Sequence, residues 1–238
     1  MNPSSIDHTM RLLDGRVLYE DNHLLILNKK AGEIVQGDKS GDEPLLEFAR
    51  CYIREKCHKT GNVFCGLVHR IDRPVSGAVV FARTSKALTR MNELVKQRRI
   101  SKVYWAIVEG VPAAEEATLV HYMQKNERTN KSYVSETEKQ GWQRAELKYL
   151  LVGKSERYSL LEVELHTGRH HQIRAQLAAV GHPIKGDVKY GARRACEDGS
   201  IMLHARALRF EHPVSHQDVS VIAEPFSPLF RKIGGLEE

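Results

Sequence analysis

Short apolar runs separated by polar or glycine-containing turns recur along the chain. Runs of this length, rich in valine, isoleucine, leucine and tyrosine, predict β-strands. Residues 145–151 alternate between apolar and polar side chains, which predicts a strand with one buried face. The other predicted strands cover residues 16–20, 24–28, 78–82, 103–108, 119–123, 160–165, 201–210 and 219–223.

Apolar residues at helical spacing occur in fewer segments. The predicted helices cover residues 44–56, 85–97 and 170–180. Ser85 is placed to cap the start of the second helix, and Gly181 to cap the end of the third. In the third helix we expect Ile173, Leu177 and Val180 to share one face.

Two further segments are too polar for either pattern. Residues 31–42 are rich in glycine and charge and predict a loop, and residues 125–139 predict a long loop or a mobile hairpin. We find no internal repeat and no linker between independent domains. Many strands with few helices predict an α+β fold whose mixed, mostly antiparallel sheet is flanked by helices and loops.

The composition is that of a globular protein, with 41% hydrophobic and 28% charged residues among 238. No apolar stretch reaches the roughly 18 residues of a membrane-spanning helix. Residues 1–10 lack the apolar core of a secretory signal, so we expect a cytoplasmic protein. The four cysteines show no C-x-x-C spacing, which predicts reduced thiols rather than a zinc site or disulfides.

The net charge of +6 is concentrated in three basic clusters, at residues 96–102, 169–174 and 192–194. Clusters of this kind suit a polyanionic partner such as nucleic acid. A solvated basic face without a partner explains the charge equally well.

One acidic residue, Asp72, lies between Arg70 and Arg73, just before a Pro-Val-Ser-Gly turn and a buried strand. The neighbouring arginines favour its ionised form, and proline and glycine allow the chain to reverse just after it. A carboxylate held in this way can act as a base, as a nucleophile or as the partner in a structural ion pair.

Two later stretches carry side chains that can serve the same site. Lys102 and Tyr104 are two apart on a predicted strand and share a face, so that the tyrosine can stack on a base while the lysine contacts phosphate. A core tyrosine beside a surface lysine is the alternative. His170 and Arg174 are four apart on the third predicted helix, and Arg174 can pair with Asp72 or hold a phosphate.

Other chemistries lack their motifs. There is no H-E-x-x-H for zinc, no glycine-rich nucleotide loop and no G-x-S-x-G nucleophile turn. We therefore expect no metal and no cofactor.

Four stretches together resemble the RluA-type branch of the RNA pseudouridine synthases, over nearly the whole chain. The first is His69-Arg70-Ile71-Asp72 followed by Ser76-Gly77, and the second is Lys102-Val103-Tyr104. The other two are residues 167–174 with 181–187, and Leu203-His204-Ala205 with His212-Pro213. The first and third stretches are specific, whereas the second and fourth are weak alone.

The resemblance implies an enzyme that isomerises uridines in ribosomal or transfer RNA to pseudouridine in a central cleft. Asp72 would be the catalytic nucleophile or base, Tyr104 would stack on the target base, and Arg174 would orient Asp72. Leu203 would line the pocket, and Arg70 would fill the gap left by the flipped nucleotide. The remaining residues expected at the substrate or RNA are His69, Arg73, Lys102, Arg169, His170 and Gln172.

The chain departs from the branch at two positions, with Val75 in place of a frequent threonine and Gln176 in place of the usual histidine. We expect residues 1–15 to be a flexible tail and residues 16–238 to be the catalytic domain, without the N-terminal RNA-binding module of many relatives. We also expect a monomer without an obligate protein partner.

Two alternatives come from other classes. One is a non-catalytic RNA-binding or RNA-folding protein on the same fold, which would not need an acid facing a polyanion. The other is a phosphate hydrolase with Asp72 as nucleophile, for which the sequence lacks a metal-binding acid cluster.

Overall fold

The computed structural model describes residues 13–235 and divides into two compact units. The first unit holds the described residues up to Ile100 together with Ala207–Glu224, and the second holds Ser101–Arg206 together with the described residues from Pro225 onward. Residues 1–12 of the predicted tail lie outside the described part of the chain. Leu13, within that predicted tail, is buried.

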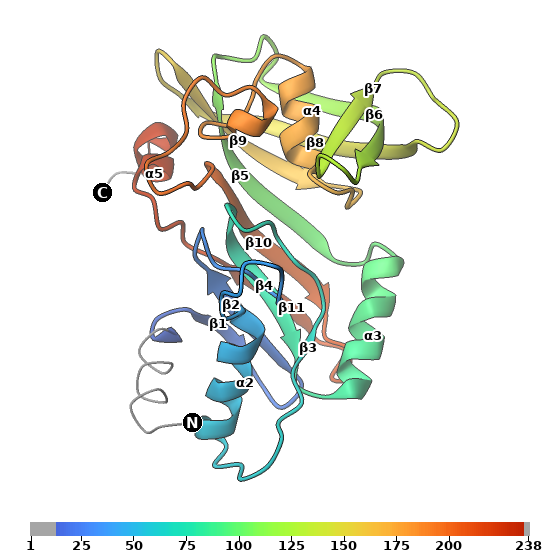
Figure 1. Ribbon diagram of the computed structural model, residues 1–238, viewed down its shortest axis with the longest axis vertical. Helices are drawn as coiled ribbons and strands as arrows, with labels where there is room; N and C mark the ends of the chain where they lie inside the picture. The colour runs from blue at the N-terminus through green and yellow to red at the C-terminus, as the bar shows by residue number, and fades with distance from the viewer. Residues whose placement is uncertain (1–12, 236–238) are drawn as a thin grey trace. The chain divides into compact units, whose positions relative to one another are not determined.

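The first unit contains a sheet in the strand order β1-β2-β4-β10, with β3 paired to β4 and β11 paired to β10 (Figure 1). The pairs β1–β2, β2–β4, β3–β4 and β10–β11 are antiparallel. The strands are β1 (Val17–Glu20), β2 (Leu24–Lys29), β3 (Gly66–Leu67), β4 (Ser76–Ala82), β10 (Leu203–Glu211) and β11 (Asp218–Ile222). The first four residues of β10 belong to the second unit.

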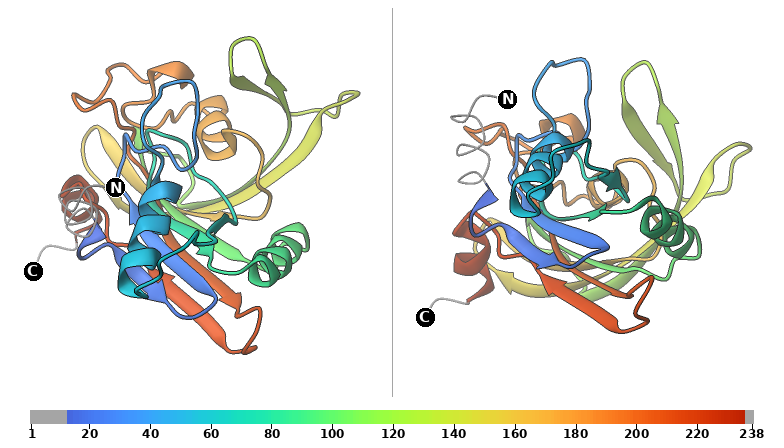
Figure 2. Two further views of the ribbon diagram at one scale, coloured as in Figure 1. Left: turned by 60° about the horizontal axis from the view of Figure 1, so that its bottom comes forward. Right: turned by 90° about the horizontal axis from the view of Figure 1, so that it is seen from below.

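Strand β2 is buried along its whole length because it lies between β1 and β4. On one face, residues of β2 and β4 such as Ile26 and Val80 pack with Met91 of α3 (Ser85–Lys96). Helix α2 (Leu45–Lys56) lies across β1 and β2 (Figures 1 and 2). The core of this unit therefore surrounds the strands that lead into and out of the Asp72 loop.

The second unit contains the strand order β10-β5-β9-β8-β6-β7, with antiparallel pairs β5–β9, β8–β9, β6–β8 and β6–β7. Its strands are β5 (Ser101–Glu109), β6 (Glu116–Asn126), β7 (Lys131–Ser135), β8 (Gln143–Lys154) and β9 (Tyr158–Leu165). Its helices are α4 (Gln172–Ala179), the 3-10 turn η1 (Val188–Tyr190) and α5 (Leu229–Gly234). The predicted alternation in β8 is confirmed, since Ala145, Leu147 and Tyr149 are buried.

The structure corrects several local predictions. Thr84, not Ser85, caps α3, because its hydroxyl accepts a hydrogen bond from the backbone N–H of Ala87 at 3.1 Å. The third helix begins at Gln172 rather than residue 170, because His171 has a left-handed backbone with φ of 54°. Val180 is 38% exposed and does not join the apolar face.

Two segments contain regular structure that the sequence pattern left open or did not predict. Residues 125–139 contain the turn and second strand of the β6–β7 hairpin, which confirms the hairpin alternative. The proline-rich end of the chain carries α5, which the sequence pattern did not predict, and Phe230 of α5 packs on Trp105.

None of the helices between residues 13 and 235 is long and apolar enough to span a bilayer. All four cysteines are free, as predicted.

Candidate active site

Asp72 lies in the loop between β3 and β4 of the first unit. The backbone N–H of Val75 donates to the carbonyl of Asp72 at 3.0 Å, and Gly77 has φ of 119°. The predicted reversal just after the acid is therefore confirmed. A positive φ of this kind favours glycine, which explains the glycine at the second position of β4.

The Asp72 loop is held from behind by a buried lysine. The Nζ of Lys29, a side chain with 0% exposure, donates to three backbone carbonyls, of Arg73 at 3.1 Å, Lys30 at 2.9 Å and Glu33 at 2.7 Å. The carbonyl of Arg73 also accepts from the N–H of Gly32 at 2.8 Å. Because an ammonium has three N–H donors, Lys29 is saturated by these contacts and fixes the backbone beside the acid.

Burial lowers the pKa of Lys29 to about 7. The nearby carboxylates of Glu33 and Asp72 oppose this shift, while Arg16 and Arg73 add to it. Glu33 is itself held by a two-point pair with Arg16, at 2.9 and 2.5 Å. Sequence reasoning missed Lys29 because a lysine at the end of a strand ordinarily reads as exposed.

The other motif residues of this loop differ in their surroundings. Arg70 is exposed and makes no hydrogen bond or ion pair within residues 13–235. Arg73 pairs with Asp42 at 2.7 Å, with both side chains about half exposed. The Nε2 of His69 accepts a hydrogen bond from the N–H of Val80 at 3.4 Å, which ties this histidine to β4. The loop thus presents Arg70 to solvent and anchors His69.

Lys102 and Tyr104 lie on β5 of the second unit and share one face of its sheet. Tyr104 is buried and pairs with Val163 of β9, which in turn pairs with Tyr149 of β8. Directly paired residues point to the same side of a sheet, so these form one row. Leu203, the first residue of β10, is also buried.

The Thr-Gly turn before α4 is organised by one amide side chain. The Oε1 of Gln172 accepts from the hydroxyl of Thr167 at 2.8 Å and from the N–H of Arg169 at 2.9 Å. Its Nε2 donates to the carbonyl of Glu146 at 3.0 Å. The guanidinium of Arg169 donates to the carbonyl of Arg144 at 3.1 Å. These bonds hold the turn on β8, which gives Gln172 a positioning role; its predicted contact with RNA stays a prediction.

Arg174 of α4 forms a buried two-point ion pair with Asp187. Its Nε and Nη2 lie 2.7 and 2.9 Å from the two carboxylate oxygens of Asp187. A guanidinium carries five N–H donors, so this pair leaves donors for the predicted contact with Asp72. Gly186 precedes Asp187 with φ of 91°, and a Cβ there would lie 2.8 Å from the carbonyl of Ser200. The Gly-Asp stretch therefore serves to deliver the partner of Arg174, which sequence reasoning did not assign.

A second cluster in this unit joins the β6–β7 hairpin to the turn before α4. The hydroxyl of Ser132 on β7 donates to the carbonyl of His170 at 2.6 Å, and its N–H donates to the hydroxyl of Tyr190 at 2.8 Å. Tyr190 also bonds to His171 at 2.9 Å, and the two histidine rings stack with centroids 3.7 Å apart. The ring of Tyr190 lies 5.1 Å from the guanidinium carbon of Arg174. In Figure 1 the hairpin stands beside α4.

Comparison with known proteins decides the family. The sequence model of the RNA pseudouridylate synthases matches residues 23–179. The chain belongs to this family. It is 31% identical over 225 residues to ribosomal large subunit pseudouridine synthase C of Buchnera aphidicola, covering 92% of this chain and 69% of the relative. It is 33% identical over 237 residues to tRNA pseudouridine synthase C of Haemophilus ducreyi, covering 92% of this chain and 95% of the relative.

The fold of this pseudouridine synthase agrees with a solved human protein, RNA pseudouridylate synthase domain containing 4. The two share 21% sequence identity with a TM-score of 0.77, over 95% of this chain and 94% of the other. The α+β fold and the resemblance to the RluA-type branch are confirmed. The protein is an RNA-modifying isomerase that converts uridine to pseudouridine.

Within the first unit the structure brings together His69, Arg70, Asp72 and Arg73 in one anchored loop. Within the second unit Tyr104 and α4, which carries Arg174, lie on the same face of the sheet. Ala145 and Tyr149 share one face of β8, Tyr149 belongs to the row of Tyr104, and Ala145 packs with α4. The predicted meeting of Asp72 with Tyr104 and Arg174 stays a prediction.

Proposed function

We propose that Asp72 is the catalytic nucleophile or base of this pseudouridine synthase, with Tyr104 against the target base and Arg174 orienting the acid. The observation that carries the proposal is that the backbone beside Asp72 is held in the first unit and the guanidinium of Arg174 is held in the second. Lys29 holds the carbonyl next to Asp72, and Asp187 holds Arg174 at two points. Groups whose backbone or side chain is held in this way lose less conformational freedom on reaching the reactive geometry.

The reaction breaks the bond between C1′ of the ribose and N1 of uracil, turns the base, and forms a bond from C1′ to C5. The proton leaves C5 and a proton is taken up at N1, so atoms and charge balance without an oxidant. That no metal or cofactor takes part stays a prediction. A uridine inside a folded RNA must first leave its stack, which costs a few kcal/mol. Arg70, exposed on the Asp72 loop, is the side chain proposed to fill the gap.

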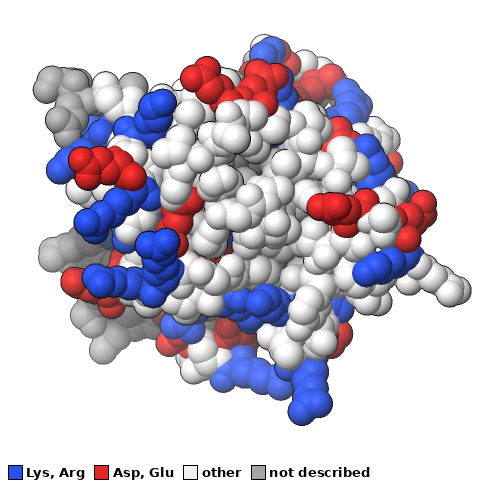
Figure 3. Space-filling view, turned by 90° about the horizontal axis from the view of Figure 1, so that it is seen from above, with Lys and Arg blue, Asp and Glu red and all other residues white. Residues whose placement is uncertain are grey.

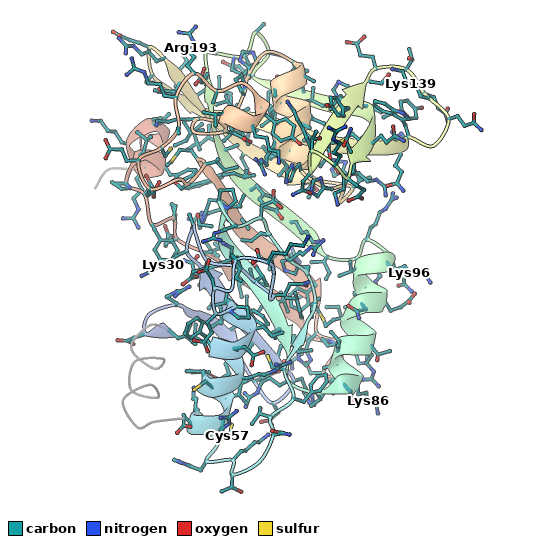
Figure 4. The ribbon with its side chains drawn as sticks, in the orientation of Figure 1. Lys30, Cys57, Lys86, Lys96, Lys139 and Arg193 are labelled. Atoms are coloured by element: carbon teal, nitrogen blue, oxygen red, sulfur yellow. The ribbon has the colours of Figure 1, made fainter. Side chains whose placement is uncertain are left out.

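The substrate we propose is a structured ribosomal or transfer RNA, since the relatives above are named for these substrates. RNA contacts are assigned to His69, Arg73, Lys102, Arg169, His170 and Gln172. Basic side chains outside the loops add to them, among them Lys86 and Lys96 at the two ends of α3 (Figure 4). On the face shown in Figure 3, basic and acidic side chains are interspersed around a largely uncharged centre, so this face shows no broad basic patch.

The remaining proposals concern the protein as a whole. We assign catalysis to residues 16–238 acting as a monomer in the cytoplasm, without an obligate protein partner. The non-catalytic alternative is not favoured, because the chain belongs to an enzyme family.

The test is Asp72→Asn, assayed for pseudouridine in ribosomal and transfer RNA and, separately, for RNA affinity. We expect product to disappear while affinity stays within a few-fold of the unchanged protein. Asp218→Asn is the matched control, because Asp218 is exposed on β11 and pairs only with Arg209 in the described structure. Near-normal turnover by Asp72→Asn would show the assignment to be wrong.

A further inference from the structure

Lys102 is a partly buried cation without a counter-charge among residues 13–235. It makes no hydrogen bond and no ion pair within the described residues, whereas Lys148 and Lys125 of the same unit each pair with a glutamate. Burial lowers the pKa of Lys102, and no carboxylate opposes the shift. Desolvating an unpaired charge is unfavourable, so such a group is more often retained where a ligand supplies the opposite charge.

The strand places Lys102 close to Tyr104. The two side chains stand on the same face of β5, roughly 7 Å apart along the strand. A lysine side chain is long and flexible enough to reach a group bound against the phenol ring. Lys148 of β8 lies on the other face, because it alternates with Leu147 and Tyr149, and Tyr149 belongs to the row of Tyr104.

We propose that the Lys102 ammonium binds a negatively charged oxygen of the target nucleotide. The inference rests on the proposed function, in which the target base lies against Tyr104. Two oxygens have this chemistry: a non-bridging phosphate oxygen, and a uracil carbonyl oxygen that gains charge when the bond from C1′ to N1 breaks and its electron pair stays on the ring. Either would supply the counter-charge that the described part of the chain does not.

The experiment compares Lys102→Met, Lys102→Arg and the control Lys148→Met. RNA affinity is measured at several salt concentrations in the Asp72→Asn background, so that turnover does not interfere. Single-turnover rates are measured with Asp72 intact and RNA saturating.

A phosphate contact predicts that Lys102→Met weakens RNA binding about tenfold. The slope of log affinity against log salt concentration should fall by about one, and Lys102→Arg should keep an affinity close to that of the unchanged protein. A uracil contact predicts unchanged affinity and a single-turnover rate lower by about 10²-fold. Lys148→Met should change neither quantity.

The proposal is overturned if Lys102→Met binds and reacts like the unchanged protein, or if Lys148→Met shows the same losses. Thermal unfolding separates these outcomes from loss of the fold, and we expect Lys102→Met to be at least as stable as the unchanged protein because it removes an unpaired charge. If the unchanged enzyme forms no pseudouridine, the proposed function fails, while the affinity measurement still tests the anion contact.

Discussion

Arg174 and Asp187 form a two-point ion pair whose side chains are 7% and 1% exposed. The aspartate comes from the Gly-Asp stretch before η1, and the arginine from α4. The two carboxylate oxygens of Asp187 set the plane of the Arg174 guanidinium, and the plane sets the direction of the remaining N–H donors. The pair is thus a support for an arginine that the enzyme is proposed to use on Asp72.

Asp187→Leu should destabilise the protein by about 3–5 kcal/mol, because it removes the carboxylate that pairs with the buried Arg174 guanidinium at two points. Chemical denaturation measures the change. Asp218→Leu is the control, since its pair with Arg209 is exposed and such pairs contribute about 0–1 kcal/mol. Equal effects of the two substitutions would contradict a structural role for the buried pair.

Lys29 should make stability rise with pH. Its pKa is about 7 in the folded protein, below its ordinary value of 10.5. Between these two pKa values the unfolded chain binds one proton more than the folded protein. The free energy of unfolding therefore rises by up to about 1.4 kcal/mol per pH unit as the pH increases, and this gain in stability disappears as the pH falls toward 7. Denaturation of the unchanged protein and of Lys29→Met at pH 7, 8 and 9 should give curves that diverge.

Parallel curves would show that Lys29 stays charged in this range. Since Lys29→Met removes three hydrogen bonds and can fail to fold, NMR titration of the Lys29 side chain in the unchanged protein measures the same pKa directly.

Ser132→Ala should loosen the β6–β7 hairpin. The substitution removes the hydroxyl that donates to the part-buried carbonyl of His170, and the loss of one such hydrogen bond costs about 1 kcal/mol. Hydrogen exchange of β7 amides should become faster. Ser135→Ala, which removes an exposed hydrogen bond to Thr137, is the control. If both variants exchange alike, Ser132 does not anchor the hairpin.

Tyr104→Phe keeps the aromatic ring and removes only the hydroxyl. If the phenol takes part in proton transfer, the single-turnover rate should fall by about 10²–10⁴-fold with RNA affinity retained. Tyr149→Phe provides a control in the same row of the sheet, where the hydroxyl donates to the carbonyl of Ala114 at 3.4 Å. Normal turnover by Tyr104→Phe would restrict Tyr104 to stacking.

Local patterns predicted most of the elements. Apolar alternation located β8, and the Pro-Val-Ser-Gly stretch located the turn after Asp72, because these features depend on neighbours in the chain. The start of α4 was misplaced, because the left-handed backbone of His171 ends the turn that precedes the helix. Helix α5 was missed, because its burial depends on packing against Trp105 from a distant strand.

The amino-acid sequence by itself determined the family, the order of the strands along the chain and the presence of an acid, a phenol and a guanidinium in recognisable motifs. Only the tertiary structure decided that Lys29 supports the Asp72 loop, that Asp187 holds Arg174, and that Lys102 has no partner in the described chain. The reason is physical: burial and pairing arise between segments far apart in sequence, and the spacing of residues along one segment carries no record of them.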